Sequence, residues 1–260
     1  MGPPALAAVS LSKSFRGVRA VEEASFTVPE GSLTALIGPN GAGKTTLFNL
    51  ITNLFRPDSG ETRFFGASLG GLSPGEIAAL GLIRTFQAAR VFPRMTTLEN
   101  ALVGAYRKGR AHALEEMLRL PRARREERLL SERAFALLDL AGLADYRDAS
   151  AIDLPMGAQK LLEVIRALMA EPRVLLLDEP AAGLNDSETG ELASLLRAIR
   201  DSGVTLVVVE HNMNLVMGIA DQVIVLDAGR VIASGAPREV QADARVIEAY
   251  IGQAEGDANA

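Results

Sequence analysis

The sequence contains no cysteine. Disulfide bonds and thiolate metal ligands are therefore excluded, and the composition gives no sign of the redox compartment. Long apolar runs are missing as well, because stretches such as VLLL (174–177) and LVVV (206–209) are far shorter than the ~20 residues that span a bilayer. The N-terminus lacks the basic start and the apolar run of a secretory signal. We expect a soluble, cytoplasmic chain that another protein would hold at any membrane.

An excess of basic residues is also missing. Lysine and arginine together number 27, against 32 aspartates and glutamates, and the net charge is −5. This balance argues against nucleic acid as the main partner, because phosphate binding requires a basic face. The basic run RLPRARREER (119–128) includes glutamates and has helical spacing, so we interpret it as a solvated helix face.

Apolar residues make up 48% of the 260 positions, enough for one large domain or a core with one inserted subdomain. Three short apolar runs, LTALIG (33–38), RVLLLD (173–178) and TLVVVE (205–210), show no polar alternation. Such runs are typical of parallel strands that are covered on both faces. A helical pattern follows each run, the first being KTTLFNLITNLF (44–55). The alternation predicts an α/β fold with a mainly parallel sheet.

Other segments depart from this alternation. Residues 5–32 and 61–66 alternate more and predict an antiparallel β subdomain, and residues 222–235 predict a hairpin around Asp227-Ala228-Gly229-Arg230. Residues 96–150 are almost entirely helix-forming and predict an inserted helical subdomain. The expected domains are a discontinuous core (1–95 and 151–254), the helical insert (96–150) and a flexible tail (255–260).

The strongest motif is GPNGAGKTT (38–46), which fits the pattern G-x-x-x-x-G-K-[ST] between a predicted strand and a predicted helix. Glycines permit the backbone to wrap so that N–H groups converge on phosphate oxygens, and the helix N-terminus adds partial positive charge. Lys44 is expected to reach the β- and γ-phosphates, and the Thr45 hydroxyl to ligate Mg²⁺. The alternative is a glycine-rich turn that matches by chance. The predicted nucleotide contacts of this loop are Gly38, Asn40, Gly41, Ala42, Gly43, Lys44, Thr45 and Thr46.

Two further strand ends carry polar residues. VLLLDEP (174–180) delivers Asp178 and Glu179 to the edge of the sheet. We expect Asp178 to hold Mg²⁺, directly or through water, and Glu179 to act as general base for the water that attacks the γ-phosphate. His211 follows the third strand, and a lone histidine there is more often structural. We predict a γ-phosphate contact for it, because such sheets bind ligands at their carboxyl edge.

The order of the motifs GPNGAGKTT, IRTFQ, LPMGAQK, LLLDEP, AAGLND and EHN resembles the nucleotide-binding subunits of ABC transporters, over essentially the full length. This resemblance implies a P-loop NTPase core of ABC type with ATP and Mg²⁺ as cofactors. It implies that Gln87 completes the Mg²⁺ shell and senses the membrane subunits, and that Phe15 stacks on adenine with Val21 packing nearby. The resemblance assigns Gly183, Leu184 and Asn185 to a loop that crosses a dimer interface.

A narrower resemblance comes from phrases such as GLIRTFQAARVFPRMTTLENALVGAY and ARVIEAYIG, which look like the ATP-binding subunit of branched-chain amino acid importers. It implies import at the cytoplasmic face of a membrane, with a second ABC ATPase, two permease subunits and a periplasmic or extracellular substrate-binding protein as partners. Importers of urea or short amides, a lipid exporter and a soluble scaffold ATPase stay open as alternatives.

The sequence departs from the family at two places. Asn185 stands where many relatives carry aspartate, and LPMGA stands where most have LSGGQ, the segment that grips the γ-phosphate on the other subunit. Pro155 removes the serine hydroxyl and one N–H, whereas Gly157 and the helix dipole remain. We therefore hypothesise pairing with a non-identical ATPase. The residues expected to act in trans are Leu154, Pro155, Met156, Gly157 and Ala158.

Overall fold

The computed structural model describes residues 2–85, 91–106 and 121–257. The chain divides into two compact units, which are described separately below. Unit 1 consists of Met1–Arg84, Arg173–Pro180 and Leu196–Ala260, and unit 2 of Thr85–Pro172 and Ala181–Leu195.

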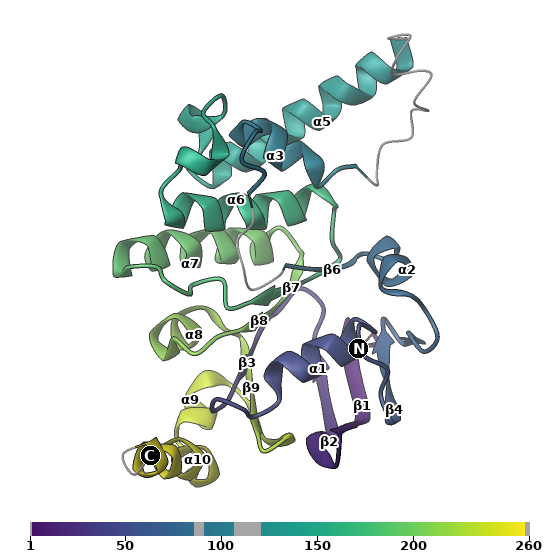
Figure 1. Cartoon of the computed structure of the whole chain (residues 1–260), viewed down its shortest axis with the longest axis vertical. Helices are drawn as coiled ribbons and strands as arrows, with labels where there is room; N and C mark the ends of the chain where they lie inside the picture. The colour runs from purple at the N-terminus through teal and green to yellow at the C-terminus, as the bar shows by residue number, and fades with distance from the viewer. Residues whose placement is uncertain (1, 86–90, 107–120, 258–260) are drawn as a thin grey trace. The chain divides into compact units, whose positions relative to one another are not determined.

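The central sheet of unit 1 has six strands in the order β10-β9-β3-β8-β7-β6 (Figure 1). All neighbouring pairs are parallel except the β9–β10 hairpin. Every residue of β3, β7 and β8 is buried, which confirms the three predicted strands. The antiparallel pairing of β9 with β10 confirms the predicted hairpin. The strands are β3 (Leu33–Ile37), β6 (Leu82–Arg84), β7 (Val174–Asp178), β8 (Thr205–Val209), β9 (Gln222–Asp227) and β10 (Arg230–Gly235).

A second sheet of unit 1 is antiparallel, with the order β2-β1-β4-β5, as the alternating segments predict. One core cluster contains side chains of both sheets, and Phe48 of α1 is fully buried in it. The two sheets and α1 therefore share one apolar core. The strands are β1 (Leu6–Phe15), β2 (Val18–Val28), β4 (Ser59–Phe64) and β5 (Ala67–Ser68).

Helix α1 (Lys44–Ile51) ends four residues before the predicted end at residue 55, and this boundary is a correction. Asn53 adopts a left-handed backbone conformation (φ 52°), which ends the helix. Its side-chain amide donates to the carbonyls of Leu69 and Leu72 at 2.7 and 3.0 Å, contacts that helical periodicity cannot reveal.

The other helices of unit 1 are short except for the last, which extends to Asp257 and so into the stretch predicted as a flexible tail. Residues 258–260 of that stretch lie outside the described residues. The helices are α2 (Pro74–Ala79), α8 (Met213–Ile219), α9 (Pro237–Gln241) and α10 (Ala244–Asp257).

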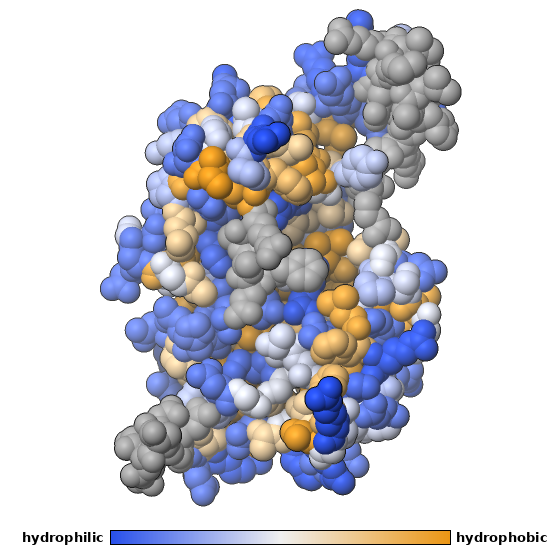
Figure 2. Space-filling view, in the orientation of Figure 1, coloured by the Kyte–Doolittle hydropathy of each residue, from blue (hydrophilic) through white to orange (hydrophobic). Residues whose placement is uncertain are grey.

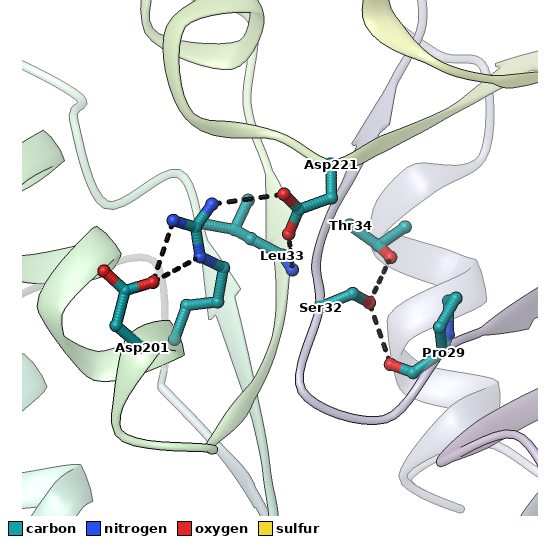
Figure 3. A network of polar contacts seen from close by, with 7 residues as sticks. Pro29, Ser32, Leu33, Thr34, Asp201 and Asp221 are labelled. Atoms are coloured by element: carbon teal, nitrogen blue, oxygen red, sulfur yellow. Dashed lines mark hydrogen bonds and ion pairs between the residues drawn. The ribbon is translucent and has the colours of Figure 1, made fainter.

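A polar network fixes the amino end of β3 (Figure 3). One carboxylate oxygen of Asp221 accepts the Leu33 N–H at 2.8 Å, and the other accepts Arg200 at 3.1 Å. Arg200 also pairs with Asp201 at 2.8 Å, and the Ser32 hydroxyl donates to a backbone carbonyl at 2.8 Å. The network orients the strand whose opposite end leads into the predicted phosphate loop.

Unit 2 is helical in its described residues. Helix α3 begins at a capping box in which Thr96 and Glu99 cap each other's backbone N–H groups. Gly104 follows it, and a Cβ there would lie 1.8 Å from the Arg166 carbonyl, so only glycine permits this close approach of α3 to α6. Residues 107–120 of the predicted insert lie outside the described residues. The helices are α3 (Thr97–Val103), α5 (Pro121–Leu140), α6 (Met156–Met169), the first part of α7 (Asp186–Asp201), and the 3-10 turns Ala144–Tyr146 and Ala151–Asp153.

No helix within the described ranges is long and apolar enough to cross a membrane. On the face drawn in Figure 2, hydrophobic residues appear between hydrophilic ones. Such mixing is usual for protein surfaces.

Candidate functional site

The loop between β3 and α1 has the backbone shape that its glycines predict. Gly43 has φ 99°, and a Cβ there would lie 2.2 Å from the Ala20 carbonyl oxygen. A Cβ at Gly38 would lie 2.0 Å from the Leu226 carbonyl oxygen, whereas at Gly41 (φ 78°) it would meet open space. Glycine is thus required at Gly38 and Gly43 by close backbone contacts, and at Gly41 by the backbone angle alone.

The turn between β9 and β10 is hydrogen-bonded to this loop. The Gly229 N–H donates to the Ala42 carbonyl at 2.9 Å, and the Gly229 carbonyl accepts the Glu22 N–H at 2.8 Å. At the start of α1, the Leu47 N–H donates to the Gly43 carbonyl at 2.8 Å, and no side chain caps the helix. The amides of residues 44–46 therefore precede the first hydrogen bond of the helix, an arrangement suited to binding an anion.

Lys44 is bound within the loop and lies near the carboxylates of Asp178 and Glu179 at the end of β7. Its ammonium donates to the carbonyls of Gly38 and Pro39 at 2.7 and 2.8 Å. Burial lowers the pKa of the Lys44 ammonium, and the nearby carboxylates of Glu179 and Asp178 partly offset that shift. The structure thus brings together three residues that the sequence predicted to serve one nucleotide.

The two carboxylates lie at the carboxyl edge of the sheet. Asp178 is the last residue of β7, and its side chain is only 4% exposed. Glu179 follows with φ 49°, in the left-handed region that non-glycine residues seldom adopt. Its N–H donates to the Val209 carbonyl at the end of β8, at 2.9 Å, so the neighbouring strand holds this conformation. Such strain is often retained at functional sites.

His211 follows the end of β8 at the same edge. The buried carboxylate of Glu210 accepts the N–H groups of His211 and Asn212 at 3.1 and 3.4 Å, which fixes the turn. The His211 side chain is 63% exposed, and Asn212 caps α8 by accepting the Leu215 N–H at 3.1 Å. The backbone of His211 is therefore fixed, and its imidazole is accessible to a ligand.

The predicted adenine contacts differ in exposure. Phe15, at the end of β1, is 40% exposed and packs edge-to-face on Phe55 with ring centroids 5.3 Å apart. The Lys13 ammonium lies 5.7 Å from the Phe15 ring centroid. Val21, by contrast, is fully buried in the core, so its side chain supports β2 instead of facing solvent.

The oxygen donors fit magnesium. Mg²⁺ usually keeps several waters and takes one or two protein oxygens together with substrate phosphates. The Asp178 carboxylate and the exposed Thr45 hydroxyl are donors of that type. Within the described ranges, no three His, Cys, Asp or Glu residues group as a closed metal site. Gln87, the third predicted ligand, lies outside the described residues.

In unit 2, the segment LPMGA forms the start of α6. Pro155 is the N-cap residue (ψ 152°), and the helix begins at Met156, one residue before the predicted glycine. The Gln159 N–H donates to the Pro155 carbonyl at 3.0 Å, and the Gln159 side chain donates to the Leu154 carbonyl at 2.9 Å. Proline fits here because an N-cap residue has an extended backbone and its own N–H makes no bond within the helix.

The predicted dimer loop ends in a capping pair. The Asn185 side chain accepts the Glu188 N–H, and the Glu188 carboxylate accepts the Asn185 N–H, both at 3.0 Å. A Cβ at Gly157 would lie 2.6 Å from the Glu188 carboxylate, so Glu188 also packs on the start of α6. Sequence analysis missed Glu188, although the spacing N-x-x-E is a recognisable capping signal.

Arg84 was missed as well. It is the last residue of β6, and its guanidinium pairs with the Asp178 carboxylate at 2.8 Å. The available signal was its place in the motif IRTFQ, three positions before Gln87.

Comparison with known proteins places these features in one family. The family described as ABC transporter matches residues 21–182, and the family described as branched-chain amino acid ATP-binding cassette transporter matches residues 230–256. The chain belongs to the ABC transporter family, whose ATP-binding cassettes hydrolyse ATP to power transport.

The relatives narrow the assignment within the ABC transporter family to branched-chain amino acid transport. The high-affinity branched-chain amino acid transport ATP-binding protein BraF of Pseudomonas aeruginosa is 40% identical over 98% of this chain and 100% of its own length. LivG of Escherichia coli, a protein of the same description, is 38% identical over the same shares. An ATP-binding cassette of an ABC transporter, solved in its ADP conformation, has a TM-score of 0.83 and 32% identity over 97% of this chain and 99% of that one. Both predicted resemblances and the predicted fold class are confirmed.

Proposed function

We propose that this chain hydrolyses ATP to drive the import of branched-chain amino acids through membrane permease subunits. The observation that carries the catalytic part is the meeting of Lys44, Asp178 and Glu179 beside the phosphate loop. The substrate class is supported by the match of residues 230–256 and by full-length relatives of that description.

The positions of the residues support the following roles. The loop amides and Lys44 would hold the phosphates, and Glu179 would accept a proton from the attacking water. His211 would contact the γ-phosphate from the end of β8. Asp178 and Thr45 would hold Mg²⁺, which supplies charge stabilisation at the phosphate oxygens when bound. Phe15 would offer its exposed ring to adenine.

The chain would work at the cytoplasmic face of a membrane, held there by two permease subunits and supplied by a substrate-binding protein on the other side. Gln87 would report the state of the permease to the nucleotide. Gln87→Ala should then leave ATP affinity nearly unchanged and uncouple hydrolysis from transport in reconstituted vesicles. An unchanged ratio of transport to hydrolysis would contradict that role.

The substrate class can be tested in the host. Deletion of the gene should impair uptake of radiolabelled leucine, isoleucine or valine, and expression of Glu179→Gln should not restore it. Intact uptake of all three, with a defect in urea or lipid handling, would assign the chain to another transporter of the family.

The partner ATPase would be non-identical. With Pro155 at the N-cap, α6 offers no hydroxyl and one amide fewer to the nucleotide of the opposite subunit. Loss of such charge-assisted hydrogen bonds should cost ~1.5–3 kcal/mol, or about 10–150-fold in trans affinity. A partner with a more complete signature would grip the Lys44 site more tightly and compensate.

Cysteine crosslinking tests this pairing, and no native cysteine of this chain can form a competing crosslink because the chain has none. Gly157 is a poor position, since the Glu188 carboxylate occupies the space of its Cβ, whereas Met156 is 61% exposed. Met156→Cys should crosslink, in the ATP state, to a cysteine at the partner's position equivalent to Asn40. Efficient crosslinking between Met156→Cys and Asn40→Cys copies of this chain, with full hydrolysis by that homodimer, would contradict the asymmetric pairing.

A further inference from the structure

Arg84 and Asp178 form a nearly buried ion pair at the ends of two adjacent strands. Strands β6 and β7 run parallel, with Arg84 opposite Leu176 in the register. The Arg84 and Asp178 side chains are 8% and 4% exposed, and Nη2 lies 2.8 Å from Oδ2. The pair engages Oδ2, so Oδ1 is the oxygen that it leaves to a metal.

The same guanidinium also holds helix α1. The Arg84 Nη1 donates to Asn49 Oδ1 at 2.6 Å, and the Arg84 Cζ lies 5.4 Å from the centroid of the Phe48 ring. Asn49 is four residues after Thr45, and residues at this spacing lie on one face of a helix. Arg84 therefore joins the Asp178 carboxylate to the helix face that carries the Thr45 hydroxyl.

We propose that Arg84 is a positioning residue that sets the magnesium ligands, Asp178 and Thr45, relative to each other before the nucleotide arrives. The proposal rests on the proposed function, because it takes these two residues as the ligands. It assigns Arg84 no contact with the nucleotide.

The chemistry of the pair favours this role over a purely structural one. Burying two charges seldom stabilises a fold more than apolar packing of similar volume would. The planar fork of arginine serves two acceptors in fixed directions, here Asp178 and Asn49, which the single ammonium of lysine cannot reproduce. Residues that orient metal ligands in this way have measurable effects on metal affinity.

The test measures ATP binding to the purified full chain by titration calorimetry, once with Mg²⁺ and once with excess EDTA. The ratio of the two affinities is the magnesium-dependent gain, and it requires no turnover. Arg84→Met should reduce this gain about 10–100-fold. Its affinity for ATP in EDTA should stay within about 3-fold of wild type, and Arg84→Lys should recover part of the gain.

Arg173→Met is the matched control. Its guanidinium also stacks on an aromatic ring of the same unit, 3.4 Å from the Phe65 centroid. Among the described residues, it forms no hydrogen bond or ion pair with Asp178 or α1. We expect a magnesium-dependent gain equal to that of wild type. If Arg84→Met does not fold, Asn49→Ala replaces it, because it removes the second acceptor and should lower the same gain to a smaller degree.

Each result decides the proposal. A wild-type or larger gain in Arg84→Met, or in Asn49→Ala where that variant replaces it, overturns the positioning role. Asp178→Asn separates this inference from the proposed function. If Asp178→Asn loses the gain and Arg84→Met keeps it, only the inference about Arg84 fails. If Asp178→Asn keeps the gain, the proposed metal ligand itself is wrong, and the role of Arg84 fails with it.

Discussion

The residues of unit 1 that we propose to bind the nucleotide and the segments of unit 2 that we propose to face a partner are held in place by different kinds of contact. In unit 1 the bonds come from distant parts of the chain: the Gly229 turn holds Ala42, and Val209 at the end of β8 holds Glu179. In unit 2 the bonds are local, between Gln159 and Pro155 and between Glu188 and Asn185.

This difference is consistent with the two departures that the resemblance implies, at Pro155 and Asn185. A change in the phosphate loop would disturb strands that are far apart in the sequence, and that loop keeps the motif in full. The hydrogen bonds of Pro155 and Asn185 join residues three or four positions apart, so a substitution there disturbs fewer distant strands than one in the phosphate loop. The proposed cis site is thus fixed by bonds between distant strands, and the proposed trans segments are held mainly by hydrogen bonds within their own helix caps.

The largest effect is expected for Glu179→Gln. The substitution removes the proposed base and keeps the side-chain size, so turnover should fall by ~10²-fold or more while MgATP remains bound. Hydrolysis and ATP retention in the assembled transporter measure it, with Lys44→Ala as the contrasting variant, which should lose binding itself. Normal steady-state hydrolysis by Glu179→Gln would exclude this residue as the base.

The next effect concerns the tertiary anchoring of the phosphate loop. Gly43→Ala places a methyl group against the Ala20 carbonyl and forces a left-handed alanine, which should destabilise the chain by about 2–3 kcal/mol. Gly41→Ala has the backbone penalty alone, about 1 kcal/mol, because its Cβ would meet open space. Urea unfolding of the two variants compares them, and equal losses would mean that the close contact behind Gly43 does not matter.

The sequence predicted the strands and the loop because their signals are local and continuous. LTALIG, RVLLLD and TLVVVE form β3, β7 and β8 with every residue buried, and GPNGAGKTT forms the loop between β3 and α1. Their position at one edge follows from parallel strand order, which is why Asp178 and Lys44 could be brought together from motifs alone.

The rest depends on contacts between residues far apart in the sequence. Arg84 and Asp178 are separated by 94 positions, and no periodicity links them. The end of α1 depends on how Asn53 bonds to Leu69, 16 residues away. The left-handed backbone of Glu179 is likewise set by a bond to a different strand. Tertiary structure alone determines these details.

A smaller effect, on association with the partner, is expected when a hydroxyl is put back at the N-cap of α6. Pro155→Ser returns a hydroxyl and an N–H at the N-cap of α6, which should tighten ATP-driven association with the partner about 10-fold. Pro155→Ala returns the N–H alone and serves as the control. Association can be followed by analytical ultracentrifugation with the Glu179→Gln background to retain ATP. If the serine and alanine variants behave alike, the hydroxyl has no part in the trans contact.

The smallest effect is expected at Asn185, and it separates capping from contact with a partner. Asn185→Ala removes the acceptor of the Glu188 N–H and should destabilise the chain by about 1 kcal/mol. Asn185→Asp should leave stability nearly unchanged, because aspartate and asparagine cap helices almost equally well and the adjacent Glu188 carboxylate offsets any gain from the new charge. Thermal unfolding of the isolated chain measures both variants, and ATP-dependent association with the partner is measured on the same samples. A large change in association for Asn185→Asp, at unchanged stability, would show that this side chain serves the interface, and that local capping alone does not account for its place in the predicted dimer loop.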